Sequence, residues 1–254
     1  MTPQRRDIGQ QYQNETKYFR EQSHWRMNAS TDSAYPHLSD SEASSTISVL
    51  PLPPAPQADL WEILKKRRSH RDFSLQPISF NDLCLLLFAV QGVTSTQNGY
   101  LFRTAPSAGA LYPIETYVLV HRVASLRSGL YHYHVAQGYL ELRRLGSFER
   151  NLASAALDQT MVADAAVSFI WTAVVHRSTR KYRERAYRYI YMDAGHIGQN
   201  LYLAATALGL GCCTIGAFYD DEINALIGVD GLSETVVYMG IVGHRLSDER
   251  LQRR

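Results

Sequence analysis

The apolar run at residues 166–175 constrains the fold most, because eight of its ten side chains are apolar and several are β-branched. A run of this composition is typical of a strand buried at the centre of a sheet. Farther along the chain, residues 188–208 place apolar side chains four and three positions apart, at Ile190, Ala194, Ile197, Leu201, Ala204 and Leu208. This spacing predicts a long helix with one apolar stripe, which Gly209 ends.

Residues 176–188 connect this strand to this helix and are strongly basic. They carry six lysines and arginines against one acid, Glu184, whereas the whole chain has a net charge of only +2. Two interpretations are open. Most charge runs are solvated connectors; the alternative is a catalytic pair, Lys181 and Tyr182, in a basic environment.

Capping signals and apolar periodicity predict the remaining elements. Asp59 can cap a helix at 60–66, and Ser79 with Asp82 forms a capping-box pattern before an apolar helix that ends at Gly92. We predict strands at 116–120, 129–134, 139–143, 212–218 and 235–242, the second and third forming a hairpin, and helices from Ser147 to about 159 and at 221–227. Because strands and helices intermix without strict alternation, the expected fold class is α+β.

The first 57 residues differ from the rest, because they combine long polar runs with a proline-rich end at 50–56. Proline favours extended backbone and cannot occupy a helix interior. We therefore expect an arm and a stiff linker at 1–57, with a short helix at 15–20. One globular domain at 58–254 would follow.

Composition argues against several classes of protein. The small net charge argues against a dedicated nucleic-acid binder. The three cysteines, Cys84, Cys212 and Cys213, supply neither a disulfide framework nor a zinc spacing. The start of the chain lacks the pattern of a signal peptide and no run of about 18 apolar residues is present, so the cytoplasm is the expected compartment.

Four clusters have the residue types of a binding site. Arg67, Arg68, Ser69 and Arg71 follow a predicted helix, and guanidinium groups match the geometry of phosphate, although surface solvation explains them equally well. The second cluster, at 106–109, would let a ligand approach the backbone closely, or it is an ordinary turn. The third, Gly209, Gly211 and Gly216, is another site of close approach or a helix stop. The fourth, at 243–245, offers a second anion contact.

Several common motifs are missing from the sequence. It has no P-loop, no dinucleotide-binding glycine fingerprint and no nucleophile elbow. The nine histidines show no metal-ligand spacing, so no metal site is expected. His121, His132 and His134 lie on predicted strands, where structural roles are the more typical.

Taken in order, these clusters resemble the nitroreductase-like flavoprotein superfamily. Within it they are most similar to the SagB-type dehydrogenases, which include thiazole- and oxazole-forming oxidases of peptide natural-product pathways. The resemblance covers about residues 57–245, and its most specific parts are the loop at 106–113 (Pro-Ser-Ala-Gly-Ala-Leu-Tyr-Pro) and the helix segment at 195–200 (Gly-His-Ile-Gly-Gln-Asn). Ala110 stands where many superfamily members have asparagine, which favours the SagB-like subgroup.

The resemblance implies a nitroreductase-like fold, with a mainly antiparallel central sheet flanked by helices. It also implies a homodimer with two FMN molecules at the subunit interface, and small residues of the 188–208 helix (Gly195, Gly198, Ala205) would suit the dimer core. The residues assigned to FMN are Arg67, Arg68, Ser69, Arg71 and Arg245 at the phosphate, ribityl chain or pyrimidine edge, Pro106, Ser107, Ala108 and Gly109 along the isoalloxazine, and Thr214, Ile215 and Gly216 near its far edge.

The implied reaction is the oxidation of an azoline ring to an azole. A base removes one hydrogen as a proton, and the flavin accepts the other as hydride. Lys181 and Tyr182 match the neighbouring lysine and tyrosine implicated as the base in oxidases of this type. Neighbouring arginines in the sequence would disfavour the charged form of the lysine and stabilise a tyrosinate.

Three functions remain open on the sequence. The first is an FMN-dependent azoline oxidase acting on a peptide or a carrier-bound chain, with oxygen reoxidising the flavin and a cyclodehydratase complex as an implied partner. The second is an NAD(P)H-dependent nitro- or quinone reductase of the same fold. The third is a flavin-free scaffold subunit of a synthetase complex.

Overall fold

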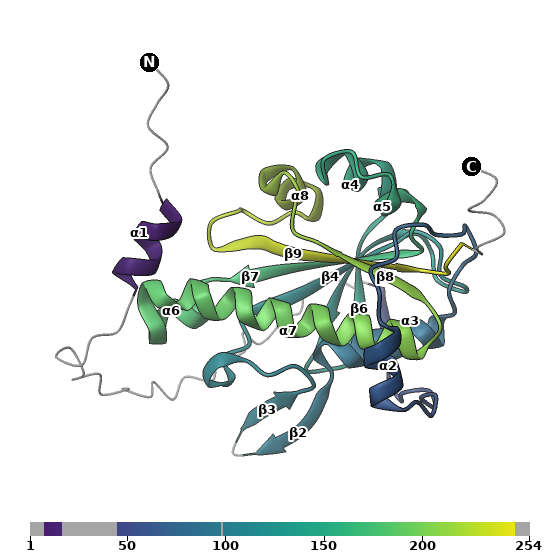
Figure 1. The fold of residues 1–254 in the computed structure, drawn as a ribbon, viewed down its shortest axis with the longest axis horizontal. Coiled ribbons are helices and arrows are strands. Elements are labelled where there is room, and N and C mark those ends of the chain that lie inside the picture. Colours follow the sequence, from purple (N-terminus) through teal and green to yellow (C-terminus); the bar gives the residue numbers. More distant parts are fainter. Residues whose placement is uncertain (1–7, 17–44, 98, 247–254) are drawn as a thin grey trace.

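The computed structural model describes residues 8–16, 45–97 and 99–246. In these residues the chain forms a sheet of seven strands in the order β1-β6-β5-β4-β7-β9-β8, and every neighbouring pair is antiparallel. The strands are β1 (Thr46–Ser48), β4 (Ile114–Val120), β5 (Gly129–His134), β6 (Tyr139–Leu145), β7 (Val167–Val174), β8 (Gly211–Ile215) and β9 (Glu234–Gly243). A separate hairpin of β2 (Val93–Gln97) and β3 (Tyr100–Arg103) projects from the body (Figure 1). The predicted α+β class is confirmed.

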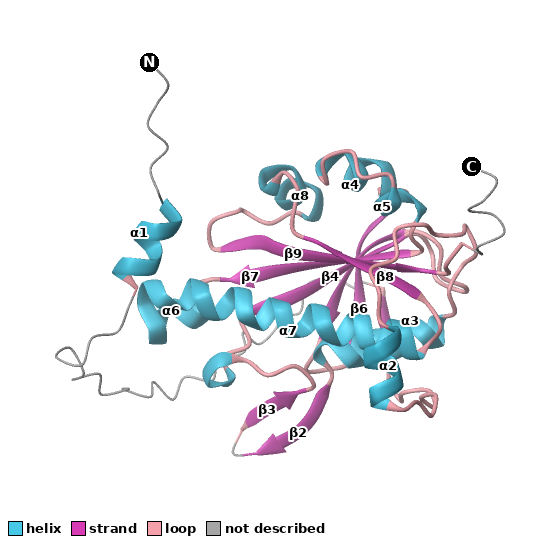
Figure 2. Cartoon of the chain, in the orientation of Figure 1, coloured by secondary structure: helices cyan, strands magenta, loops and turns pink. Residues whose placement is uncertain are grey.

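Helices cover both faces of the sheet (Figure 2). One face packs against α3 (Phe80–Gln91) and α7 (Ala186–Ala207), and the other against α4 (Glu149–Ala155), α5 (Met161–Asp164) and α8 (Asp220–Ile227). The shorter elements are α1 (Ile8–Glu15), α2 (Leu60–Lys66), α6 (His176–Tyr182) and the 3₁₀ turns η2 (Ala108–Ala110) and η3 (Arg183–Arg185). In the described ranges, every helix is too short or too polar to cross a membrane.

The predicted central strand is β7, which lies between β4 and β9 and is almost wholly buried. Phe169 and Trp171 join the core beneath α3 and α7, whereas Ile170 joins the core on the opposite face. The long helix α7 approaches the sheet closely. A Cβ on Gly240 of β9 would lie 2.6 Å from a methyl group of Leu201 and 3.0 Å from the Trp171 ring, so only glycine fits there.

Two helix starts follow the predicted capping chemistry. The Asp59 carboxylate accepts hydrogen bonds from the backbone N–H groups of Trp61 and Glu62, at 2.8 and 3.0 Å, as α2 begins. Ser79 Oγ accepts from the Asp82 N–H at 3.0 Å, and the Asp82 carboxylate accepts in return from the Ser79 N–H at 3.3 Å. The capping box before α3 is therefore confirmed.

The helix predicted from Ser147 to 159 is wrong in both its cap and its length. α4 begins after Phe148, and the chain makes no side-chain cap there. Leu157 and Asp158 then adopt left-handed backbone, with φ of 59° and 57°, which no helix interior allows. The segment is consequently divided into α4 and α5. The strand predicted at 212–218 also ends early, since β8 stops at Ile215.

The N-terminal segment contributes to the sheet. β1 pairs antiparallel with β6 and forms one edge, with Ile47 opposite Leu140. α1 ends at Glu15, where the predicted helix at 15–20 was expected to begin, and residues 17–20 lie outside the described residues. The β2–β3 hairpin and α6 were not predicted from the sequence.

The core beneath α3 offers a direct test of the fold. Leu87 is fully buried, so replacing it with alanine should lower the free energy of unfolding by about 2–5 kcal/mol through lost contacts and a residual cavity. Leu232 is 85% exposed, and Leu232→Ala should change the stability by less than about 0.5 kcal/mol. Urea denaturation at matched protein concentration measures both. Equal stability of the two variants would contradict the placement of α3.

Candidate functional site

A basic cluster lies where α2 ends and the chain crosses the end of β8. The His70 N–H donates to the carbonyl of Cys212 on β8 at 2.9 Å, which fixes the crossing. The Arg67 guanidinium lies over the ring of Tyr202, 5.1 Å from its centroid. Burial lowers the pKa of His70, and the positive charges of Arg245 and Arg67 lower it further. Two of the predicted phosphate-binding cations therefore lie near one another.

The close packing of this cluster depends on Gly211. A Cβ there would lie 2.9 Å from Cγ of Arg245 and 3.1 Å from Cβ of His70. Arg68 is directed elsewhere: its guanidinium donates to the carbonyls of Lys65 and Arg67, at 3.0 and 2.7 Å, and closes the end of α2. Arg71 is exposed on the same loop.

Tyr202 of α7 organises the polar contacts beside these arginines. Its hydroxyl shares a hydrogen bond with Ser69 Oγ at 2.8 Å and accepts one from the Thr214 N–H at 3.0 Å. Thr214 Oγ1 in turn accepts from the Tyr238 hydroxyl at 2.6 Å. The structure thus brings Ser69 and Thr214 together. Sequence reasoning missed Tyr202, although a tyrosine on a buried helix needs a partner for its hydroxyl.

A second cluster forms around the loop that precedes β4. Gly109 and Ala110 adopt left-handed backbone, with φ of 64° and 52°. Ser107 Oγ donates to Asp193 at 2.6 Å, and the Ala108 N–H donates to the other carboxylate oxygen at 3.2 Å. Asp193 belongs to α7 and is only 4% exposed. A single buried carboxylate therefore holds the predicted isoalloxazine-binding loop in place.

Asp193 lies two residues before the helix segment at 195–200 that carries the resemblance, and it received no role from the sequence. Burial raises its pKa, and the hydrogen bonds from Ser107 and Ala108 oppose that shift. An acid beside the apolar stripe of a predicted helix was the available signal, because such a group needs donors when it is buried.

The proposed catalytic pair converges on the same loop. Lys181 and Tyr182 end α6, and both are partly buried. A Cβ built on Gly109 would lie 2.6 Å from the Tyr182 hydroxyl oxygen and 2.8 Å from Lys181 Nζ. The side chains therefore occupy the space that only a glycine leaves open. Lys181 Nζ also lies 5.4 Å from the centroid of the Tyr182 ring.

The expectation that the basic stretch stabilises a tyrosinate is wrong. Burial raises the pKa of Tyr182, and Tyr189 and Asp193 raise it further. Arg185, three residues after Tyr182 in the sequence, instead donates to the Tyr189 hydroxyl at 3.0 Å and to the carbonyl of Thr16. Tyr182 therefore keeps its proton at neutral pH.

Arg177 anchors α6 beside the loop. Its guanidinium pairs with the Glu115 carboxylate on β4 and also donates to the carbonyl of Tyr112 at 3.3 Å. The Glu115 side chain is mostly buried, and His132 and Arg177 hold the pKa of its carboxyl at about 2 against the effect of burial. Part of the basic stretch is therefore structural, because Arg177 fixes the start of α6, whose other end carries Lys181.

The two clusters lie along α7 in one chain. Asp193 and Tyr202 are nine residues apart, which corresponds to about 13 Å along a helix axis. One cluster supplies guanidinium groups and a serine hydroxyl, which suit a phosphate. The other supplies a loop of small residues at 106–109, in which Gly109 is exposed, and such a loop suits the approach of a flat ring to the backbone. The donor chemistry of both clusters fits a flavin mononucleotide.

Comparisons with known proteins identify the family of the chain. The sequence model of the nitroreductase family matches residues 64–244, which is most of the chain. The chain belongs to the nitroreductase family. Members of this family are flavin oxidoreductases and typically bind FMN.

The chain is similar in sequence to two named relatives. It is 41% identical over 179 residues to the nitroreductase-type protein MJ1384 of Methanocaldococcus jannaschii, an alignment that covers 70% of this chain and 88% of the relative. It is 32% identical over 178 residues to the trifolitoxin-processing protein TfxB of Rhizobium leguminosarum bv. trifolii, covering 66% of this chain. The chain spans about half of TfxB, 48% of its length.

Two solved structures share the fold. A nitroreductase-type protein of Anabaena variabilis superposes with a TM-score of 0.69 and 33% identity, over 80% of this chain and 42% of that one. A chain of the Escherichia coli microcin synthetase McbBCD complex, solved with truncated pro-MccB17 bound, gives a TM-score of 0.61 and 20% identity, over 78% and 77% of the two chains. Because the identity to the McbBCD chain is only 20%, this similarity shows a shared fold and nothing more.

Proposed function

We propose that this protein is an FMN-dependent dehydrogenase of the SagB type, which oxidises a thiazoline or oxazoline in a peptide or carrier-bound natural product to the azole. The observation that carries the proposal is the convergence of Lys181 and Tyr182 on Gly109. A lysine and a tyrosine beside a flavin-type loop supply a proton acceptor and a proton donor at one point. Reduction of a nitro or quinone group does not require removal of a carbon-bound proton.

The chain's own residues divide the work of the reaction. FMN, when bound, supplies the acceptor for hydride. Lys181 accepts the proton from the adjacent ring carbon. Tyr182 keeps its proton, because its pKa is raised, and its hydroxyl orients the substrate by a hydrogen bond. Asp193 keeps the loop in place through Ser107 and Ala108.

The other site residues are proposed to bind FMN in the roles given in the sequence analysis, with the exception of Arg68. The cations of Arg67, Arg71 and Arg245 would hold the phosphate, together with the Ser69 hydroxyl. Residues 106–109 would line the ring system, and Thr214, Ile215 and Gly216 would approach its far edge. Arg68 is left out because its guanidinium is engaged with the end of α2.

A homodimer is proposed with the outer face of α7 at its centre. Tyr191 and Met192 are more than half exposed there, and Gly195 has open space around it. Gly198, expected on the same small-residue face, serves the chain's own packing, because a Cβ on it would lie 2.8 Å from the Tyr238 ring. The likeness to TfxB supports a processing role, and we propose a cyclodehydratase complex as the partner that supplies the azoline.

A second candidate is an NAD(P)H-dependent nitro- or quinone reductase, which the 41% identity to MJ1384 favours. An absorption spectrum of the purified protein, followed by incubation with an azoline peptide, separates the candidates. Flavin bands and a substrate mass lower by two hydrogens are expected. Bleaching of the flavin by NAD(P)H alone, without oxidation of the azoline, would select the reductase. Colourless protein that takes up no FMN would leave the scaffold function.

Arg71→Ala tests the phosphate cluster. Loss of one charge-assisted phosphate contact should weaken FMN binding by roughly tenfold or more, so that dialysis removes the flavin. Lys66→Ala is the matched control, since its ammonium is exposed and pairs with Glu62. The FMN affinity of the two variants is compared by flavin absorbance after dialysis, and separately by fluorescence titration with FMN. An Arg71→Ala variant that remains saturated with FMN would refute the assignment.

A further inference from the structure

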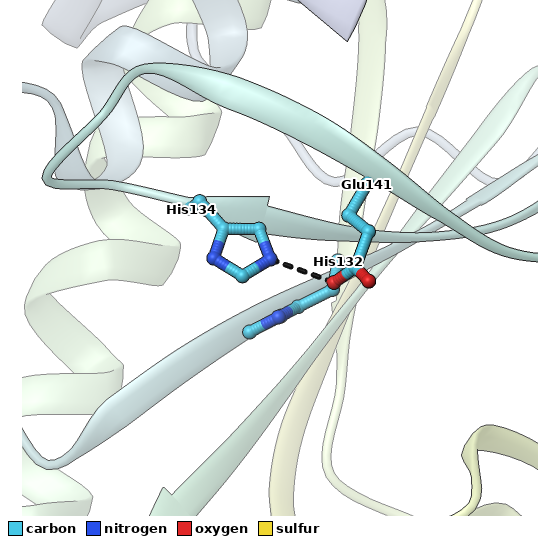
Figure 3. A group of neighbouring side chains, drawn as sticks. All are labelled: His132, His134 and Glu141. Atoms are coloured by element: carbon cyan, nitrogen blue, oxygen red, sulfur yellow. Dashed lines mark hydrogen bonds and ion pairs between the residues drawn. The ribbon is translucent and has the colours of Figure 1, made fainter. Parts of the chain in front are cut away.

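Three side chains with metal-binding groups gather on one face of the β5–β6 hairpin, away from the flavin-type loop. His132 and His134 are two positions apart on β5 and so point to the same face. Glu141 on β6 lies directly opposite His132 in the strand register. Their ligand atoms all lie within 4.8 Å of one another. Figure 3 shows the His134 ring directed at the Glu141 carboxylate, with the His132 ring beside them.

The spacing is close to that of a coordination shell. His134 Nε2 and Glu141 Oε2 are 2.8 Å apart. Two ligands bound to one zinc at about 2.0–2.1 Å are roughly 3.3 Å apart in a tetrahedral site. A metal ion would therefore fit between these two atoms after the His134 and Glu141 side chains move slightly apart. The His132 ring would supply the third ligand.

Neighbouring side chains already fix the two rings. His132 Nε2 is hydrogen-bonded to Glu115 Oε2 at 3.0 Å, so Nδ1 is the nitrogen left for a metal. A carboxylate on the second ring nitrogen is the usual way in which a protein orients a metal-binding histidine. The Tyr117 ring stacks on His132 at 4.6 Å, and the Tyr139 ring stacks on His134 at 4.5 Å.

The three side chains are largely buried but can still be reached from solvent. The side chains of His132, His134 and Glu141 are 16%, 9% and 11% exposed, so an ion can enter from solvent and lose most of its water. Arg143 Nη1 contacts both oxygens of Glu141 at 3.3 Å and competes with a cation for that carboxylate. Its side chain is 53% exposed and can turn into solvent when the carboxylate binds a metal.

We propose that His132, His134 and Glu141 bind one divalent transition-metal ion of the zinc type, with a fourth position open to water. Two imidazoles and one carboxylate are ligands that suit Zn²⁺ and Co²⁺. The ion ties β5 to β6 and holds His132 against Glu115. Because Glu115 also pairs with Arg177, the ion braces the start of α6, whose other end carries Lys181.

Metal content of the full-length protein tests the site. After chelator treatment and equilibrium dialysis against micromolar zinc chloride, the wild-type chain should retain about one equivalent of zinc. His134→Gln and Glu141→Gln should each weaken zinc binding by roughly tenfold or more. His196→Gln, which removes an exposed histidine on α7, is the matched control and should retain the wild-type content.

Two further measurements test the site if a variant of a metal ligand folds poorly. Arg143→Gln removes the competing cation and should bind zinc several-fold more tightly than the wild type. Cobalt chloride should give visible d–d absorption bands in the wild type, and zinc should bleach them. Wild-type protein that retains less than about a tenth of an equivalent of zinc would overturn the proposal. Wild-type affinity in the folded Glu141→Gln variant would do the same.

Discussion

Replacing Lys181 with alanine and Tyr182 with phenylalanine together is expected to abolish azoline oxidation while leaving the protein yellow. The double variant removes the proton acceptor and the hydroxyl donor at Gly109, and general acid–base groups contribute roughly 10²- to 10⁴-fold to a rate. FMN retention should persist, because the phosphate cluster lies around Tyr202, along α7 from the pair. Product formation by mass spectrometry and the flavin spectrum measure the two effects separately.

The matched control is Lys65→Ala with Tyr219→Phe, which changes the same residue types at exposed positions. Its activity should equal that of the wild type. Single variants sharpen the assignment: Lys181→Ala should cost more activity than Tyr182→Phe, because only the lysine accepts the proton. The pKa of Tyr182 is raised above its ordinary value of 10, so its ionisation should cause no loss of activity below about pH 10. Full activity in the double variant would end the base assignment.

Gly109→Ala is expected to lower the rate of oxidation by roughly 10²-fold, because misplacing a catalytic group by about an ångström costs that much. The new Cβ would lie 2.6 Å from the Tyr182 hydroxyl and 2.8 Å from Lys181 Nζ, so one of the pair must move. The left-handed backbone, at φ of 64°, adds strain of about 1 kcal/mol.

Gly228→Ala separates the two causes. Gly228 follows α8, has φ of 81° and has open space where its Cβ would lie. This control should show the backbone strain as a loss of stability, with unchanged activity. Thermal unfolding and steady-state rates of both variants provide the comparison. A wild-type rate in Gly109→Ala would show that the loop and the pair do not meet in the working enzyme.

Local chemistry predicted much of the fold. The capping box of Ser79 and Asp82 and the apolar run that becomes β7 depend on neighbours within a few residues, so the sequence is sufficient for them. Ser147 has the right residue type for a cap, but α4 begins after Phe148 without a side-chain cap. The predicted helix is also too long, because left-handed backbone at Leu157 and Asp158 divides the segment. β1 is only three residues long and gains its structure from pairing with β6, which no local pattern encodes.

The sequence suggested residues for the candidate site, but it did not indicate the contacts between them. Lys181, Tyr182 and the loop at 106–109 were identified separately, and only the packing of α6 places them together. Tyr202 and Asp193 gain their roles from partners far away in the chain. The error about the tyrosinate has the same origin, since Arg185 is only three residues from Tyr182 in the sequence but its guanidinium is engaged by Tyr189 and Thr16.

β1 also has a consequence for how the chain can be shortened. The strand satisfies the outer backbone groups of β6, and the Leu142 N–H donates to the carbonyl of Ser45 at 3.1 Å. A chain that began at residue 58 would keep every helix of the two cores, yet it would leave those N–H and C=O groups unpaired. Such an edge is a template for strands of other molecules. We therefore expect β1 to protect the protein against self-association along β6, and a soluble shortened form should begin before residue 45.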